Sequence, residues 1–450
     1  MQATTDPHDD FIRAACVPRD AMHASGTIDR AAAILAAHPE VAGASIHAAA
    51  ILGDDDGVRR FIAQDASNAT EKGGPYEWDA LTHLCFSNSL RLDPARSDGF
   101  VRAAQALLDA GASANTGWYE AEHQPDAIWE SALYGAVGIA HHPGLTQLLL
   151  ERGADPNDVE VAYHTPESYD NRALQLLLDT GRLTDDSLAL MLVRKHDWHD
   201  YEGAKLLLEH GIDLNRPGRR WQPFHHAILR DNSAEMVELL LDHGADPALS
   251  HGGRSAVALA ARRGRGDLLA LFERRGISTG LQGVDALIAA CARDEADAVK
   301  STAAHEPHLV ADLLADGGKL LAEFAGNANT EGVRNLLDLG VPVDARTVEG
   351  DGYFGVARDS TALHVAAWRA QYDTVRLLID RGAMVNARDG SGRTPLMLAV
   401  RACVDSYWTA RRSPASVDAL LRAGASAAEI RHPSGYDEVD ELLRQHGALA

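Results

Sequence analysis

A short phrase that ends in glycine recurs along this chain and constrains its fold more than any other feature. It reads Leu-Leu-(Leu/Ile)-x-x-Gly-(Ala/Ile), and its best copies occupy residues 148–154, 206–212, 239–245 and 377–383. From Gly211 to Gly244 is 33 positions, and from Gly244 to Gly276 is 32. A period of this length indicates a stacked array of short repeats. The 450 residues are therefore better described as one repeated unit than as three unrelated domains.

The residues between these glycines predict two antiparallel helices and a turn in each unit. A threonine at Thr361 or Thr394 can cap a helix start, and Pro395 is tolerated in a first turn. Gly382 follows the next helix, where a positive φ angle costs glycine little. Asp389 and the glycine after it then signal a tight turn. Because one such pair cannot bury its own apolar faces, the pairs must stack on their neighbours.

The segment from residue 361 to residue 399 resembles the ankyrin repeat family. The matching positions are Thr361-Ala362-Leu363-His364, residues 375–383, Val385-Asn386, Asp389, Gly392 and Thr394-Pro395-Leu396. Weaker copies cover most of residues 28–447, which suggests about ten to twelve units. The resemblance implies an all-α ankyrin solenoid and a scaffold that binds a partner protein or peptide through its concave face. It also implies structural roles for His225 and His364, which would hydrogen-bond backbone in neighbouring turns.

The quality of the repeats divides the chain into four parts. Residues 1–27 are expected to form an N-terminal cap, and residues 28–276 are repeats with inserted loops. Residues 277–317 match the pattern poorly, so a bend or a segment of low stability is expected there. Residues 318–450 are read as C-terminal repeats and a cap.

Several inserts interrupt the repeats and are the places where specificity could reside. Long turns are expected at residues 113–126, 155–167 and 341–358, and inserts between paired helices at 87–99 and 402–413. Because most of them contain aromatic residues, we expect them to fold back onto the repeats.

Tryptophan and arginine residues at groove-facing positions are the predicted partner-binding residues. These residue types dominate binding hot spots because they combine a large contact area with planar hydrogen bonding. Alternatively, the tryptophans before the inner helices only pack the inserts down, and the sequence leaves both interpretations open. The predicted set is Trp78, Trp129, Trp221, His226, Arg230, Trp368, Arg369 and Arg401.

The charge balance argues against binding to nucleic acid or membrane. The chain has 42 Lys and Arg against 65 Asp and Glu, a formal net charge of −23, which phosphate backbones and anionic lipids would repel. The four cysteines are far apart and predict neither a metal cluster nor a disulfide framework. We expect a cytoplasmic protein without metal or cofactor.

No catalytic sequence template is present, so enzymatic activity is not expected. The spacing of His196 and His199 would suit a metal ion, but the pair falls at a break between two predicted helices, and no metal site is predicted there. The alternative function is a small-molecule pocket or an enzyme site beneath the inserts. Its lining would include His83, Trp221, His226, Asp231 and Trp368.

Overall fold

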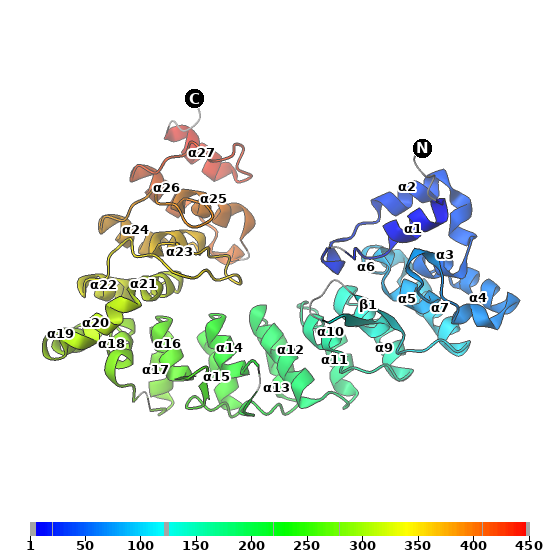
Figure 1. Ribbon diagram of the computed structural model, residues 1–450, viewed down its shortest axis with the longest axis horizontal. Coiled ribbons are helices and arrows are strands. Elements are labelled where there is room, and N and C mark those ends of the chain that lie inside the picture. Colours follow the sequence, from blue (N-terminus) through cyan, green and yellow to red (C-terminus); the bar gives the residue numbers. More distant parts are fainter. Residues whose placement is uncertain are drawn as a thin grey trace. The chain divides into compact units, whose positions relative to one another are not determined.

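The computed structural model describes residues 6–19, 21–120, 126–218, 220–278, 280–406 and 408–446. The described chain is built from helices, with two small antiparallel hairpins (Figure 1). It divides into unit 1, residues 1–226, and unit 2, residues 227–450. Each unit is an all-α stack of helix pairs, which confirms the predicted fold class.

Unit 1 begins with two capping helices and continues with repeated pairs; the helix α14, Pro223–Leu229, contains the division between the units. Its other helices are α1 Pro7–Ala15, α2 Asp29–Ala37, α3 Ile46–Ile51, α4 Asp55–Gln64, α5 Ala80–Cys85, α6 Asn88–Leu92, α7 Ser97–Asp109, α8 Ala132–Tyr134, α9 Pro143–Glu151, α10 Val159–His164, α11 Arg172–Asp179, α12 Asp185–Asp197 and α13 Tyr201–Leu208. A π-helical turn, Gly135–Ile139, extends α8. The strands β1, Gly117–Glu120, and β2, Ile128–Ser131, form one hairpin.

Unit 2 contains the remaining helices and the second hairpin. The helices are α15 Ala234–Asp242, α16 Ala256–Arg262, α17 Gly266–Arg274, α18 Gly283–Ala292, α19 Ala296–His305, α20 Pro307–Ala315, α21 Gly317–Gly326, α22 Thr330–Asp338, α23 Ala362–Trp368, α24 Tyr372–Asp380, α25 Pro395–Asp405, α26 Ala415–Arg422 and α27 Asp437–Gln445. The hairpin pairs β3, Ser250–His251, with β4, Arg254–Ser255.

Successive repeats pack inner helix on inner helix and outer helix on outer helix. In unit 1, α3 packs on α5 and α10 on α12, while α4 packs on α7 and α9 on α11. In unit 2, α21, α23 and α25 form the inner row, and α22, α24 and α26 form the outer row. The glycine phrase ends the outer helices as predicted, since φ is +89° at Gly153 and +85° at Gly382.

His364 ties one repeat to the next, as the resemblance implied. Its Nδ1 accepts from the Thr361 backbone N–H at 3.2 Å, and its Nε2 lies 3.1 Å from the carbonyl oxygens of Ala387 and Arg393. Because both neighbours of Nε2 are acceptors, we assign the proton to Nε2. Burial lowers the pKa of His364, which keeps the imidazole neutral. The second histidine of this kind, His225, is buried.

The poorly matching segment at residues 277–317 contains three helices instead of two. Here α18 packs on α16, on α19 and on the extra helix α20. The inner helix α16 also contacts α21, which belongs to the following repeat. Asn329 joins these repeats, because its Nδ2 donates to the carbonyl oxygens of Gly264 and Ala292 at 2.7 Å each. A Cβ at Gly266 would lie 2.2 Å from the Ala292 oxygen, so this close approach requires glycine.

One predicted insert is wrong, and two others contain regular secondary structure. Residues 155–167 are not one long turn, because α10 occupies residues 159–164 of them: Asp158 caps the helix, and Val161 and Ala162 are buried. The insert at 113–126 contains β1, while its residues 121–125 lie outside the described part of the chain. The insert at 87–99 contains α6.

Replacing His364 with alanine should destabilise unit 2 by about 1–3 kcal/mol, because two buried carbonyl oxygens lose their donor. The free energy of unfolding in urea, together with hydrogen exchange in α23 and α25, measures this loss. His308→Ala, at an exposed position on α20, is the control and should change stability by less than about 0.5 kcal/mol. A loss at His364 no larger than in the control would contradict the assigned role.

Candidate functional site

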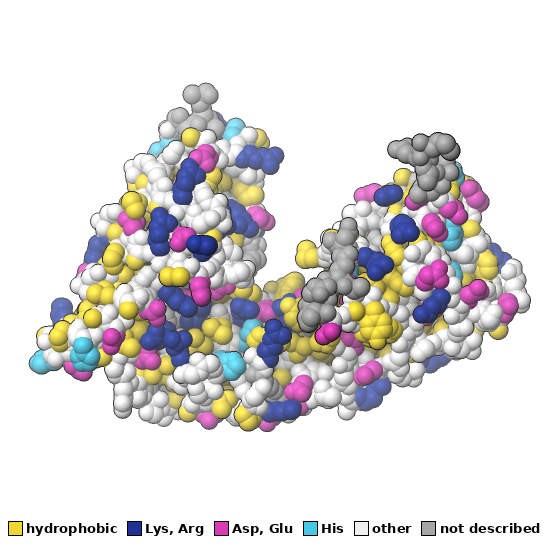
Figure 2. All heavy atoms as spheres, viewed as in Figure 1, with side chains coloured by type: hydrophobic (Ala, Val, Ile, Leu, Met, Phe, Trp, Pro, Cys, Tyr) yellow, Lys and Arg dark blue, Asp and Glu magenta, His cyan; other side chains and the backbone are white. Residues whose placement is uncertain are grey.

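The predicted partner-binding residues fall into two sets, one in each unit. Trp78, Trp129, Trp221 and His226 belong to unit 1, whereas Arg230, Trp368, Arg369 and Arg401 belong to unit 2. Figure 2 shows basic and acidic side chains interspersed over the visible face of each unit rather than gathered by charge.

In unit 1, Trp78 packs beneath the β1–β2 hairpin. Its ring stacks on Trp118 of β1 with centroids 4.9 Å apart, and the centroid of His83 lies 5.3 Å away. Trp78 is only 4% exposed. The geometry thus favours the packing interpretation for this tryptophan, because a partner could not contact its ring without displacing the hairpin.

Trp129 and Trp221 keep part of their surface available. Trp129 lies half-buried on β2, where its ring meets Tyr119 edge-to-face at 4.8 Å. Trp221 precedes α14 and is 37% exposed. The guanidinium carbon of Arg220 lies 4.4 Å from the centroid of the Trp221 ring. An exposed indole with a stacked guanidinium is suited to binding another surface.

An open cavity of about 360 Å³ lies beside Trp221. The inner helix α12 forms one wall through Ala189, Leu190 and Val193, and the segment before α14 forms the other. We call this cavity the Trp221 pocket; its described lining is Asp186, Ala189, Leu190, Val193, Arg216, Pro217, Gly218, Arg220 and Trp221. A second open cavity, of about 530 Å³, lies in unit 2 at the breaks between paired helices and is bordered by Asp267, Glu273, Asp294 and Glu295 among others.

Four carboxylates gather beneath the hairpin of unit 1, a cluster that the sequence did not predict. Burial, together with the charges of Glu160, Glu120 and Asp158, raises the pKa of Glu130 to about 8. At neutral pH this carboxyl group is therefore mainly protonated. The only signal in the sequence is the presence of Glu120 and Glu130 in an aromatic insert, which does not show that the two side chains meet.

Histidine and arginine side chains balance the neighbouring carboxylates. Burial opposes a charge on His164, but hydrogen bonds with Glu160 at 3.2 Å and Glu167 at 3.0 Å raise its pKa to about 9. Arg194 pairs with both Glu167 and Asp197. The Nε2 atom of buried His226 lies 2.8 Å from Asp197 Oδ1. His226 is thus buried against Asp197 and does not point toward solvent.

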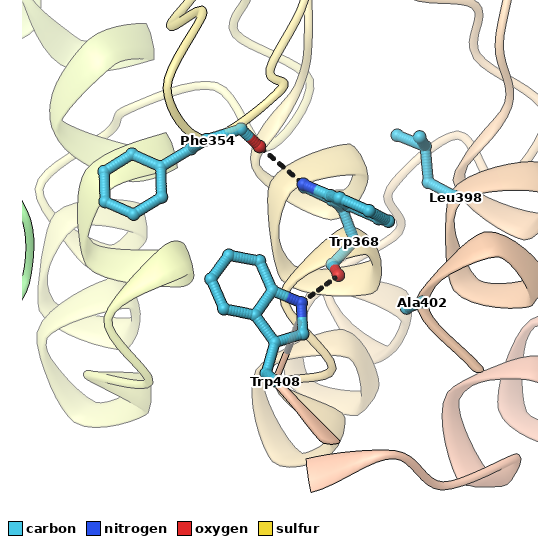
Figure 3. Packing of buried hydrophobic residues seen from close by; sticks show 5 residues of the cluster. All are labelled: Phe354, Trp368, Leu398, Ala402 and Trp408. Atoms are coloured by element: carbon cyan, nitrogen blue, oxygen red, sulfur yellow. Dashed lines mark hydrogen bonds between the residues drawn. The ribbon is translucent and has the colours of Figure 1, made fainter. Parts of the chain in front are cut away.

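In unit 2, Trp368 lies in an aromatic cluster made by two inserts. Figure 3 shows its indole beside Phe354, from the 341–358 insert, and Trp408, from the 402–413 insert. Trp368 Nε1 donates to the Phe354 oxygen at 2.5 Å, and Trp408 Nε1 donates to the Trp368 oxygen at 3.2 Å. The predicted folding back of these inserts is thus observed at both places, and Trp368 is only 4% exposed. Tyr407 lies outside the described residues.

Arg369 belongs to a buried ion cluster with Asp231 and Arg263. Its Nη1 donates to Asp231 Oδ2 at 2.6 Å, and Arg263 donates to both Asp231 oxygens at 2.8 Å each. Arg263 Nη1 also lies 3.0 Å from Glu323 Oε2. Burial opposes the carboxylate, but the two guanidinium groups hold the pKa of Asp231 well below its usual range. The cluster joins the ends of α16 and α23 to the loop after α14.

Arg230 and Arg401 stand over aromatic rings at the edge of unit 2. The guanidinium carbon of Arg230 is 3.9 Å from the Tyr353 ring centroid, and that of Arg401 is 4.6 Å from the Trp368 ring. Arg401 also lies 3.6 Å from Asp405 and remains exposed. Of the residues predicted in this unit, Arg401 therefore offers the most accessible surface.

The described residues contain neither a metal-binding cluster nor a membrane-spanning helix. No group of three or more His, Cys, Asp or Glu side chains within the described ranges is arranged to hold a metal ion. None of the described helices combines the length and the apolar character that crossing a bilayer requires. All four cysteines are buried free thiols.

A family model that describes three consecutive ankyrin repeats matches this chain at residues 161–251 and again at residues 320–426. The two matched segments of this chain are ankyrin repeats. Its repeats are similar to those of serine/threonine-protein kinase 12 of Arabidopsis thaliana, at 38% identity over 19% of this chain and 17% of that protein. The NF-kappa-B inhibitor cactus of Drosophila melanogaster is 24% identical over 35% of this chain and 28% of its own length. The B-cell lymphoma 3 protein homolog of Mus musculus is 33% identical over 34% of this chain and 37% of its own length.

These curated relatives are therefore matched over little more than a third of their length at most. Among solved structures, the ankyrin repeat domain of Bcl-3 matches 51% of this chain and 97% of its own chain, at 23% identity and a TM-score of 0.21. The repeats and the relatives together support a protein–protein interaction domain.

Replacing Glu130 with glutamine should stabilise the protein increasingly as the pH rises. The folded state holds a proton on Glu130 up to about pH 8, whereas a free glutamate releases it near pH 4.5. In wild type, the contribution of Glu130 to the free energy of unfolding is therefore largest below about pH 4.5, and it is lost as the pH rises toward about 8. The variant should gain up to about 1 kcal/mol per pH unit over wild type in between. Urea unfolding at several pH values measures this, with exposed Glu202→Gln as a control that should show no such trend.

Replacing Asp231 with asparagine should destabilise unit 2 by about 3–5 kcal/mol, because it leaves two buried guanidinium groups without their carboxylate. The matched control is Asp405→Asn, which removes the exposed partner of Arg401 and should cost less than about 1 kcal/mol. Urea unfolding followed by circular dichroism compares the two. Equal effects would show that the buried cluster contributes no more than a surface ion pair.

Proposed function

We propose that this protein is a scaffold that binds a partner protein or peptide, and that the Trp221 pocket is an anchor point of its binding surface. The observation that carries the proposal is the exposed Trp221 ring beside an open cavity. Large exposed aromatic side chains at the rim of a cavity are the usual centres of binding energy.

The pocket is held in shape before any partner arrives. Arg216 Nη1 lies 3.1 Å from Asp185 and 3.0 Å from Asp186, both on α12. Arg220 stacks on Trp221 at the same time. Side chains that are already ordered lose less conformational entropy on binding, which favours affinity.

The lining indicates the chemistry of the partner segment. Val193, Leu190 and the Trp221 ring offer apolar contact, and the exposed Arg220 lies at the rim. An apolar side chain that is followed by a carboxylate would match this surface. The name of the relative NF-kappa-B inhibitor cactus describes action on another protein, which agrees with a protein partner here.

The solvent-accessible members of the predicted set support the same role, and the buried members support it only indirectly. Trp129, Arg230 and Arg401 keep exposed or half-exposed side chains. Trp78, His226, Trp368 and Arg369 are buried, so we propose that each stabilises the repeats and inserts of its own unit. Binding along the whole predicted concave face, a cytoplasmic location and the absence of nucleic-acid, membrane and cofactor binding stay predictions.

The alternative, a small-molecule or enzyme site, finds limited support. A volume of about 360 Å³ falls within the range of ligand pockets. Its described lining, however, contains one carboxylate, Asp186, and no histidine, which is too little for a general acid and base pair. The protein-binding scaffold remains the proposed function.

Replacing Trp221 with alanine should weaken binding of a specific partner about 30-fold, the effect of losing about 2 kcal/mol at a hot spot. An affinity capture followed by quantitative mass spectrometry compares the variant with wild type. Trp198→Ala is the matched control, because Trp198 is 36% exposed in the same unit but does not line the pocket. If the Trp221 variant retains every partner that the control retains, the pocket is not the anchor.

A further inference from the structure

The N-terminal segment at residues 16–27, here called the strap, is fastened to the insert that contains α6. The Val17 N–H donates to the Phe86 oxygen at 2.9 Å, and Asn88 Nδ2 donates to the Cys16 oxygen at 2.8 Å. At the other end, Arg91 Nη2 donates to the Gly26 oxygen at 2.7 Å. Residue 20 lies outside the described residues. The strap is thus held by hydrogen bonds to its backbone and by the buried side chains of Cys16 and Val17, while residues 23–25 form a 3-10 turn.

Two side chains of the strap enter the aromatic and acidic surface beneath it. The guanidinium carbon of Arg19 lies 4.9 Å from the Trp118 ring centroid and 5.4 Å from that of Tyr76. His23 Nδ1 lies 3.0 Å from Tyr134 Oη. Between them Met22 is 81% exposed, so the middle of the strap adds little to its hold.

The surface under the strap has the composition of a site for cationic side chains. Aromatic faces attract a guanidinium through their quadrupole, and nearby carboxylates add charge attraction. Here Tyr76 and Trp118 supply the rings that face Arg19. Glu120 lies 3.6 Å from His23 Nε2 and supplies the charge attraction. Glu130, in the next strand of the same hairpin, is buried and mainly protonated at neutral pH, so it offers a hydrogen-bonding group rather than a charge.

The fit between the strap and this surface is incomplete. Among the described residues, Arg19 Nε, Trp118 Nε1 and Glu130 Oε2 are buried without a hydrogen-bond partner. Buried donors and acceptors are almost always paired in a well-fitted interface. Two unpaired donors, one on the strap and one on the surface, and an unpaired carboxyl oxygen suggest that a different peptide can satisfy this surface better.

We propose that the strap-covered surface of unit 1, formed by Tyr76, Trp118, Tyr134, Glu120 and Glu130, is a docking site for an extended, arginine-bearing segment of a partner protein. The strap occupies this site in cis and must be displaced before the partner segment can bind. The inference rests on the proposed function because it names the chemistry of a protein partner. It concerns a surface other than the Trp221 pocket, and its test uses a defined peptide, so the two can fail separately.

The test measures binding of a fluorescent synthetic peptide of residues 17–27 to the full chain. In wild type the strap competes, so the peptide should bind at least about tenfold more tightly to an Arg19→Ala/His23→Ala double variant, in which the strap loses its two inserted side chains. A peptide that carries the Arg19→Ala change should bind about tenfold more weakly than the parent peptide. Arg30→Ala, at an exposed position on α2, is the control variant and should behave as wild type.

Hydrogen exchange separates docking from a purely structural role. In wild type, excess peptide should increase exchange in the strap and leave α3, α5 and α7 unchanged. If the double variant binds the peptide no better than wild type while these helices keep their protection, the surface is not a docking site. If the double variant instead loses protection across these helices, the strap is a structural cap and the proposal is also wrong.

Discussion

The contact between neighbouring helix pairs is the interaction on which the rest of this structure depends. A pair such as α23 and α24 is too short to bury its own apolar side chains, so each pair is stable only against the pairs beside it. His364 adds directional bonds to this contact by holding two carbonyl oxygens of the following turn. Stability is consequently local, and a change in one repeat is felt mainly by its neighbours.

The inserts change what the inner helices expose. In unit 1 the β1–β2 hairpin covers Trp78 through Trp118, and in unit 2 two inserts enclose Trp368. Large aromatic side chains on the inner side of the repeats are therefore used for packing, which removes their apolar area from water. The surface left for partners is smaller and more polar than a uniform array would present.

Buried charge accompanies these inserts. The cluster of Asp231, Arg263 and Arg369 joins repeats that are distant in sequence, and a charge buried there is tolerated only because it is paired in good geometry. Glu130 is the opposite case, since its carboxyl group is surrounded by other carboxylates and stays protonated near neutral pH. The surface beneath the strap thus combines aromatic rings with acidic groups.

The role of His364 came from the resemblance to ankyrin repeats, whereas the sequence by itself determined the repeated helix pairs, their glycine ends and the positions of most inserts. These follow from patterns within one repeat, where the relevant residues are close in sequence. The prediction of a long turn at residues 155–167 was wrong, because the apolar pattern of α10 is too short to distinguish a helix from a turn. Only the tertiary structure decided that Trp78 and Trp368 are buried while Trp221 is exposed, that Glu120 and Glu130 meet, and that Asp231 reaches Arg369. Each of these features depends on how an insert or a bend brings residues together that are far apart in the sequence. A periodic pattern within one repeat contains no information about such contacts.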